Sequence, residues 1–318
     1  MSSIVAVAGG SRGLGRAIVE AILADNKHHV FILSRQTSEE GEKEIGARFL
    51  QVDYSDIDNI KTLLEHHKID TVISALSAKA IGLYEMNLAV ASEKSNVTTR
   101  YIPSIWGIKY PASSPLPFGP PKAAVMDFLK TTDLEYSAWY TGFFIDYYVS
   151  PPLKSPLDHW TVFIDIANRT AALPGSGDVP VAMSYTMDVA KFVAGSLSLS
   201  KWERETLIYN DKLTMNQYVQ VVEEVRGEKI QVTYDSLDLL KSGKITELPS
   251  HPPMYEFVSK DVIQSFLAAF GILFETGEFD LREGYRIQDG LPSLKLQNFR
   301  DLLTQNSCLL VVAVHSTM

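Results

Sequence analysis

Apolar positions in the first half of the chain follow two alternating patterns. Short continuous apolar runs occur at residues 4–8, 29–34, 48–52, 71–75 and 100–102. Apolar residues at helical spacing lie between them, near residues 15–25, 57–64 and 88–91. Continuous runs are typical of parallel strands that are buried on both faces. The order therefore predicts an α/β fold in which right-handed crossovers build a Rossmann-like, doubly wound parallel sheet.

The second half of the chain has a mixed pattern. Prolines at 151, 152 and 156 interrupt it, and residues 161–164 with 169–173 predict a hairpin. A helix is expected to start near Asp188. The remaining expected elements are strands near residues 207 and 232 and helices near 214–226 and 259–270.

A glycine-rich segment follows the first predicted strand and leads directly into a helical pattern. Its residues are Gly9, Gly10, Ser11, Arg12, Gly13, Leu14 and Gly15, with the spacing G-x-x-x-G-x-G. Glycines allow a tight turn and close approach of a phosphate, while the helix N-terminus attracts negative charge. The segment predicts a dinucleotide pyrophosphate site; the alternative is a tight turn that binds no ligand.

Residues after the next strands refine this prediction. Arg35 ends the second strand, where an acidic residue would bind a ribose hydroxyl and an arginine accommodates a 2′-phosphate. Together with Arg12 it favours NADP(H) over NAD(H), unless either side chain simply faces solvent. Asp53 is expected near the adenine, although it also suits an ordinary turn. The small segment Ser74, Ala75 and Leu76 is expected beneath the ribose.

Composition limits the other functions. The chain has 318 residues, 46% hydrophobic, with 29 basic and 38 acidic residues and a net charge of −9. This balance predicts no general attraction to nucleic acid or to an anionic membrane. With one cysteine, Cys308, no internal disulfide can form, and no secretion signal is recognised, so a cytoplasmic protein is expected. No metal-ligand spacing occurs, and the 307–318 tail suits neither a helix nor a solvated end.

The chain resembles the NmrA-like and isoflavone-reductase-like proteins, an atypical branch of the short-chain dehydrogenases/reductases. The matching pieces are AGGSRGLG at 8–15, SR at 34–35, VDYSD at 52–56, RYIPSIWG at 100–107, KAAVMDFLKTTDLEYSAWYTGFFIDY at 122–147 and YTMDVAKFVAGSL at 185–197. The resemblance implies an NADP(H)-binding domain over 1–150, extended by about 180–210, and a smaller α+β substrate region over 151–318. A small-molecule substrate and a monomer or homodimer are expected.

The resemblance also implies a role for Lys122, as acid/base or as a group that orients the nicotinamide ribose. From the residues alone, Lys122 opens a helix after a loop of about a dozen residues containing Pro111, Pro115, Pro117, Pro120 and Pro121. A cation there can polarise a carbonyl or imine; the alternative is a solvated lysine. Typical short-chain enzymes have a tyrosine four residues earlier, where this chain has Phe118.

Other hydroxyl groups and aromatic rings complete the prediction. Ser104 is expected in the cofactor site, and the hydroxyls considered as replacements for the missing tyrosine are those of Tyr84, Tyr110, Tyr140 and Ser104. The aromatic residues expected in the wall of a substrate pocket, or alternatively in the core, are Trp106, Trp139, Tyr140, Phe143 and Phe144.

The first hypothesis is an NADPH-dependent reductase of a small apolar or aromatic metabolite, acting at a conjugated C=C, a C=N or a benzylic centre. The resemblance suggests a tailoring step in secondary metabolism. Two alternatives stay open: a dinucleotide-sensing regulator without turnover, and an NADP(H)-binding enzyme that directs a cyclisation.

Overall fold

The computed structural model describes residues 2–77, 80, 82–149, 153–158 and 160–305. The chain forms two compact units, each assembled from segments that are separated in the sequence. The first contains the residues up to 141 together with 186–208 and 283–295, and the second contains 142–185, 209–282 and the residues from 296 on. The sequence had suggested a boundary near residue 150; in the structure the chain passes between the units at 141 and 142.

The first unit is built on a six-stranded parallel sheet with the order β3-β2-β1-β4-β5-β6. Its strands are β1 (Ile4–Ala8), β2 (His29–Ser34), β3 (Arg48–Gln51), β4 (Thr71–Ser74), β5 (Arg100–Ile102) and β6 (Glu135–Tyr136). Its helices are α1 (Gly13–Asp25), α2 (Glu39–Ile45), α3 (Ile57–His66), α4 (Leu83–Lys94), α5 (Gly119–Leu129) and α7 (Thr186–Ser196). The predicted doubly wound fold is confirmed.

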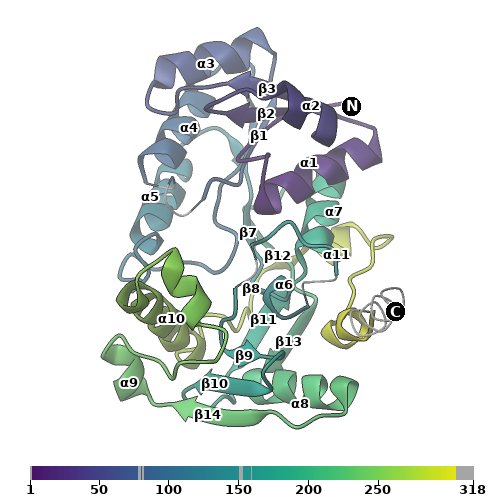
Figure 1. The fold of residues 1–318 in the computed structure, drawn as a ribbon. Coiled ribbons are helices and arrows are strands. Elements are labelled where there is room, and N and C mark those ends of the chain that lie inside the picture. The colour runs from purple at the N-terminus through teal and green to yellow at the C-terminus, as the bar shows by residue number, and fades with distance from the viewer. Residues whose placement is uncertain (1, 78–79, 81, 150–152, 159, 306–318) are drawn as a thin grey trace. The chain divides into compact units, whose positions relative to one another are not determined.

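Helices cover both faces of this sheet. Figure 1 shows α3, α4 and α5 along one side and α1 and α7 along the other. Strand residues such as Val5, Ala6 and Val72 have no exposed surface, which explains why the strands are continuous apolar runs. The strand order reverses between β1 and β4, so the loops after these two strands lie side by side. In open α/β sheets this switch point is where ligands bind.

A second, smaller sheet of the same unit has the order β15-β12-β7. Its elements are β7 (Ala138–Tyr140), β12 (Glu205–Leu207) and β15 (Tyr285–Arg286), followed by α11 (Ile287–Gly290). The extended segment at residues 135–140 is divided at Ser137 into two strands, because β6 pairs with β5 whereas β7 pairs with β12.

The second unit has two three-stranded sheets, β14-β10-β9 and β13-β11-β8. Its strands are β8 (Phe143–Phe144), β9 (Ile164–Asp165), β10 (Thr170–Pro174), β11 (Pro180–Ser184), β13 (Asp211–Thr214) and β14 (Gln231–Asp235). Its helices are α6 (Asp146–Val149), α8 (Met215–Arg226), α9 (Leu237–Lys241), the 3₁₀ helix η1 (Pro252–Glu256) and α10 (Lys260–Glu275). The predicted hairpin is present as the antiparallel pair β9 and β10, although β9 is only two residues long.

The proline-rich loop is shorter than predicted. Pro120 and Pro121 were expected outside regular structure, but both lie in the first turn of α5, which starts at Gly119. Proline is tolerated there because the first N–H groups of a helix have no partner within it. As a result Lys122 lies in the first turn of α5 and not at its first residue.

No helix among the described residues is both long and apolar enough to cross a membrane. Cys308 and the tail at 307–318 fall outside the described residues.

Candidate active site

The glycine segment forms a tight turn between β1 and α1. Gly9 has a φ of 77°, and a Cβ at this position would lie 2.5 Å from the carbonyl oxygen of Ala75. A Cβ at Gly15 would lie 2.3 Å from the carbonyl oxygen of Gly9. Both contacts are with backbone, which cannot turn aside as a side chain can. The glycines therefore bring the loop after β4 and the start of α1 against the turn.

The N-terminus of α1 is open to an anion. Arg12 is its N-cap residue, its side chain makes no capping hydrogen bond, and the first turn contains no acidic residue. In α3, by contrast, the Asp56 carboxylate caps the first turn. Free N–H groups and the helix dipole favour a bound phosphate. The residues present thus fit the pyrophosphate of a dinucleotide.

Two arginine side chains near this turn are available to bind an anion. Arg12 and Arg35 are both exposed, and neither guanidinium forms an ion pair with any described residue. Arg16, one turn further along α1, is bound to Glu20 and Glu44. Free guanidinium groups can bind a phosphate through paired hydrogen bonds.

Asp53 takes part in a turn after β3. Its Oδ1 accepts hydrogen bonds from Ser55 Oγ at 2.6 Å and from Ser55 N at 2.9 Å. These bonds lower the pKa of the Asp53 carboxyl. The two hydrogen bonds are sufficient to explain why an aspartate occupies this turn. The second carboxylate oxygen of Asp53 has no hydrogen bond within the described residues. A role near the adenine stays a prediction.

The loops after β4 and β5 are joined by side-chain hydrogen bonds. Ser104 Oγ donates to the Leu76 carbonyl at 2.9 Å, and Trp106 Nε1 donates to the Ser74 carbonyl at 2.8 Å. Trp106 has a φ of 21°, which L-residues rarely adopt, and its ring bond helps to hold that conformation. The structure therefore brings together four residues that the sequence had placed in the cofactor site or the substrate pocket: Ser74, Leu76, Ser104 and Trp106. Ala75 lies between Ser74 and Leu76 in the chain.

Lys122 is buried, with 7% of its surface exposed. Its Nζ donates to the Ile105 carbonyl at 2.6 Å and lies 4.8 Å and 5.1 Å from the ring centres of Tyr110 and Phe118. Burial lowers the pKa of the Lys122 ammonium from 10.5 to about 7, and the charge of Glu85 opposes that shift. Phe118 occupies the position at which typical short-chain enzymes have a tyrosine, and its ring packs against the lysine.

Glu85, on α4, was not singled out from the sequence. Its carboxylate accepts hydrogen bonds from Ser74 Oγ, from Tyr101 OH at 3.0 Å and from Ser104 N at 3.0 Å. Burial raises the pKa of Glu85, while these bonds and the Lys122 charge lower it. We call Lys122, Glu85, Ser74, Tyr101 and Ser104 the lysine cluster. The sequence contained one indication that Glu85 is buried, because its spacing places it on the same helix face as the apolar residues Leu88 and Ala89.

The remaining aromatic residues of the prediction lie elsewhere. Tyr140 is buried in β7, and its OH donates to Glu205 Oε1 at 3.4 Å. Burial raises the pKa of Tyr140, and the negative charge of Glu205 raises it further. Phe143 belongs to the second unit, where its ring packs against an aromatic core that includes Phe274 and Phe279. Core packing accounts for Phe143, whereas the half-buried Phe144 follows it in β8. Their role in a substrate pocket stays a prediction.

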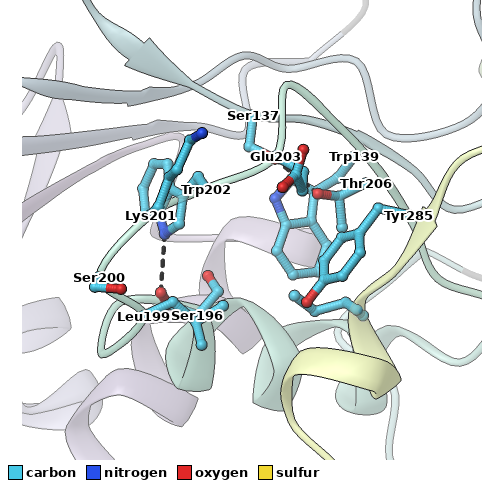
Figure 2. Close-up of a pocket in the computed structure, with 11 residues that line it drawn as sticks. Ser137, Trp139, Ser196, Leu199, Ser200, Lys201, Trp202, Glu203, Thr206 and Tyr285 are labelled. Carbon is cyan, nitrogen blue, oxygen red and sulfur yellow. Dashed lines mark hydrogen bonds between the residues drawn. The ribbon is translucent and has the colours of Figure 1, made fainter.

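A small cavity of about 130 Å³ lies in the first unit, beside the β15-β12-β7 sheet. Figure 2 shows Trp139, Glu203, Thr206 and Tyr285 on one side and the residues from Leu199 to Trp202 on the other. Trp202 Nε1 donates to the Ser196 carbonyl at 2.8 Å and closes part of its wall. Neither the glycine turn nor the lysine cluster contributes to this lining.

A sequence profile of the NmrA-like family matches residues 1–282. The chain belongs to the NmrA-like family. One relative, "Oxidoreductase BOA1" of Botryotinia fuckeliana, is 36% identical over 279 residues, which cover 86% of this chain and 89% of the relative. Another, "Oxidoreductase swnN" of Metarhizium robertsii, is 28% identical and covers 81% of this chain and 83% of its own length.

Solved structures share the fold of this NmrA-like chain. Leucoanthocyanidin reductase of Vitis vinifera in complex with NADPH has a TM-score of 0.74 at 18% identity, covering 95% of this chain and 99% of that one. AtPrR2 with NADP+ and (+)pinoresinol has a TM-score of 0.72 at 19% identity, covering 96% and 99%. At these identities the likeness concerns the fold.

Proposed function

We propose that this protein is an NADPH-dependent reductase in which Lys122 supplies the positive charge and the proton of the reaction. The observation that carries the proposal is the buried Lys122, whose pKa of about 7 keeps both of its protonation states accessible near neutral pH. Relatives named as oxidoreductases and neighbours of the same fold that hold NADPH or NADP+ support it.

The cofactor would be held by residues of the first unit. The turn at Gly9–Gly15 and the open end of α1 suit the pyrophosphate, while Arg12 and Arg35 suit a 2′-phosphate. Asp53 is assigned to the adenine end, and the loops with Ser74, Ala75, Leu76 and Ser104 to the remainder. NADPH, when bound, supplies a hydride to an electrophilic carbon of the substrate.

Lys122 completes the reaction by acting on the substrate atom that gains negative charge. An ammonium has three N–H donors, and one of them is given to the Ile105 carbonyl. The others find no acceptor among the described residues and are left for an oxygen or nitrogen of the substrate. Proton transfer leaves a neutral amine, which the low pKa favours, and water returns the proton.

The substrate class follows from the chemistry of this group. A proton donor with a pKa near 7 suits a carbonyl-conjugated C=C, a C=N or a benzylic C–O bond, each of which needs one hydride and one proton. We assign the protein to a small apolar or aromatic metabolite of this kind, in a tailoring step of secondary metabolism. Trp106, which lies in the same unit as Lys122, is the aromatic residue proposed to face it.

The experiment is a screen for NADPH oxidation with conjugated enones, cyclic imines and benzylic ethers, using the wild type and Lys122→Met. The variant keeps the length of the side chain and removes its charge. We expect turnover to fall by at least about 100-fold, the scale of a lost general acid, while NADPH affinity stays within a few-fold.

Three results would overturn the proposal. Undiminished turnover in Lys122→Met would remove the lysine from the mechanism. Product formation with no net consumption of NADPH would indicate a directed cyclisation. Tight NADPH binding with no turnover on any compound class, together with capture of a protein partner, would indicate a regulator.

A further inference from the structure

Glu85 and Lys122 are two buried ionisable side chains on different helices of the same unit. Glu85 lies on α4 with 1% of its surface exposed, and Lys122 lies on α5 with 7% exposed. A buried charge is costly unless an opposite charge and hydrogen bonds compensate for it. We propose that Glu85 is a positioning residue for Lys122: it fixes the backbone that accepts the lysine's hydrogen bond and supplies the negative charge that favours the ammonium. The proposal rests on the role proposed for Lys122.

Glu85 is connected to Lys122 through the hydrogen bonds of three consecutive residues after β5. The Glu85 carboxylate accepts the N–H of Ser104, and the carbonyl of the next residue, Ile105, accepts Lys122 Nζ. The following residue, Trp106, is held in an unfavourable backbone conformation by its ring bond to the Ser74 carbonyl. A segment fixed at each of three successive residues has little freedom to move its carbonyl.

Glu85 also contacts the last residue of β4. It accepts the hydroxyl of Ser74, whose own carbonyl accepts Trp106 Nε1. One carboxylate therefore connects the ends of β4 and β5, the strands whose loops are assigned to the cofactor. Other buried acids of the chain have different partners: Asp235 accepts from Thr246, and Asp165 accepts from Asn168 and Ser250.

The charge of Glu85 acts on the protonation of Lys122 in one direction. Burial raises the pKa of the Glu85 carboxyl, while its three hydrogen-bond donors and the Lys122 charge oppose that rise and favour the ionised form. The negative charge of ionised Glu85 favours the protonated form of Lys122. The titratable groups around the pair are Tyr101 from β5, Tyr54 after β3, which acts on Tyr101, and the Tyr110 ring beside Nζ. Burial raises the pKa of Tyr54 and of Tyr101, so both stay neutral near pH 7.

The test measures the titration of Lys122 itself. The full-length protein is labelled competitively with an amine-reactive anhydride over a range of pH, and mass spectrometry follows the peptide that contains Lys122. Glu85→Gln removes the charge and retains an oxygen acceptor and nearly the same shape. Glu93→Gln, on the same helix, removes a partly exposed carboxylate that accepts Asp133 N and serves as the matched control.

In Glu85→Gln we expect the pKa of Lys122 to fall by about one unit or more, the scale of a lost neighbouring charge, and in Glu93→Gln to stay at the wild-type value. An unchanged or higher pKa of Lys122 in folded Glu85→Gln overturns the proposal. If Glu85→Gln does not fold, Tyr101→Phe removes one donor from the carboxylate and is expected to lower the pKa of Lys122 by a smaller amount. An unchanged pKa there then overturns it.

This readout separates the two proposals. A Lys122 that titrates near 7 in the wild type and in Glu85→Gln contradicts only the role of Glu85. A Lys122 that titrates near its ordinary value of 10.5 in the wild type contradicts the proposed function as well.

Discussion

The glycine turn and the lysine cluster lie in the same unit but are built in opposite ways. The turn is made of backbone: two glycines that no larger residue can replace without a clash, and a helix end without a side-chain cap. The exposed guanidinium groups of Arg12 at that end and of Arg35 after β2 form no ion pair with any described residue. The lysine cluster is made of buried side chains from α4, α5, β4, β5 and the loop after β5. In it Glu85 accepts hydrogen bonds from Ser74, Tyr101 and Ser104, while Lys122 donates to the Ile105 carbonyl. The glycine turn can therefore bind a negatively charged ligand, whereas the lysine cluster sets the protonation state of Lys122.

This difference predicts that substitutions in the two regions will have separate effects. Changes at the turn should alter cofactor affinity, and changes at the cluster should alter the protonation of Lys122. The predictions below test this separation, starting with the largest expected effect.

The largest effect is expected from Gly15→Ala. Its Cβ would lie 2.3 Å from the Gly9 carbonyl oxygen, so the turn must open. We expect NADPH affinity, measured by calorimetric titration, to fall by more than about 100-fold, or about 2.7 kcal/mol. Gly82→Ala is the control, because a Cβ there would contact nothing within 4 Å. Equal affinity of Gly15→Ala and the wild type would show that the cofactor does not bind at this turn.

The second largest effect is expected from Arg35→Ala, which should weaken the binding of NADPH and leave that of NADH unchanged. Hydrogen bonds to a charged group contribute about 1.5–3 kcal/mol, so we expect NADPH to bind about 10- to 100-fold more weakly and NADH to be unaffected. Arg16→Ala is the matched control, since Arg16 is already paired with Glu20 and Glu44. Equal weakening of NADPH and NADH would contradict a 2′-phosphate role for Arg35.

The pH dependence of turnover should follow Lys122. Its pKa is lowered to about 7, so the ammonium form predominates below that pH and is lost as the pH rises through it. At saturating NADPH we expect turnover to fall about fivefold from pH 7 to pH 8, as the protonated fraction does. NADPH affinity measured at the same pH values separates binding from catalysis. A turnover that rises through this range would make Lys122 a base and not an acid.

Phe118→Leu should have the smallest effect. The Phe118 ring centre lies 5.1 Å from Lys122 Nζ, and a cation over an aromatic face is stabilised by about 0.5–1 kcal/mol or more. Leucine keeps the site apolar and removes that attraction. We expect the pKa of Lys122 to fall by a few tenths of a unit, while NADPH affinity is unchanged. A rise in the pKa would contradict the contact.

The same contrast explains what the sequence could predict. The strand at 4–8, the glycine turn and the first helix form one local segment, so their pattern predicted a structure that is confirmed. Lys122 was found through the resemblance of the segment at 122–147. The position of Pro120 and Pro121 was wrong because proline is compatible with both a loop and the first turn of a helix.

Glu85 was missed for a physical reason. Its three hydrogen-bond donors lie 11, 16 and 19 residues away, and they meet only when β4, β5 and α4 assemble. Its position on the buried face of α4 was visible, but a glutamate there is informative only once burial is known. Likewise, Tyr110 and Phe118 could be considered as single residues, whereas their shared contact with Lys122 is a tertiary feature.

The most direct test of this account is the titration of Lys122 in the wild-type protein by competitive labelling. A lysine enclosed by the Tyr110 and Phe118 rings and bound to the Ile105 carbonyl should titrate at about 7. A titration near 10.5, with labelling as fast as that of exposed lysines, would contradict the account, because Lys122 would then be an ordinary solvated cation.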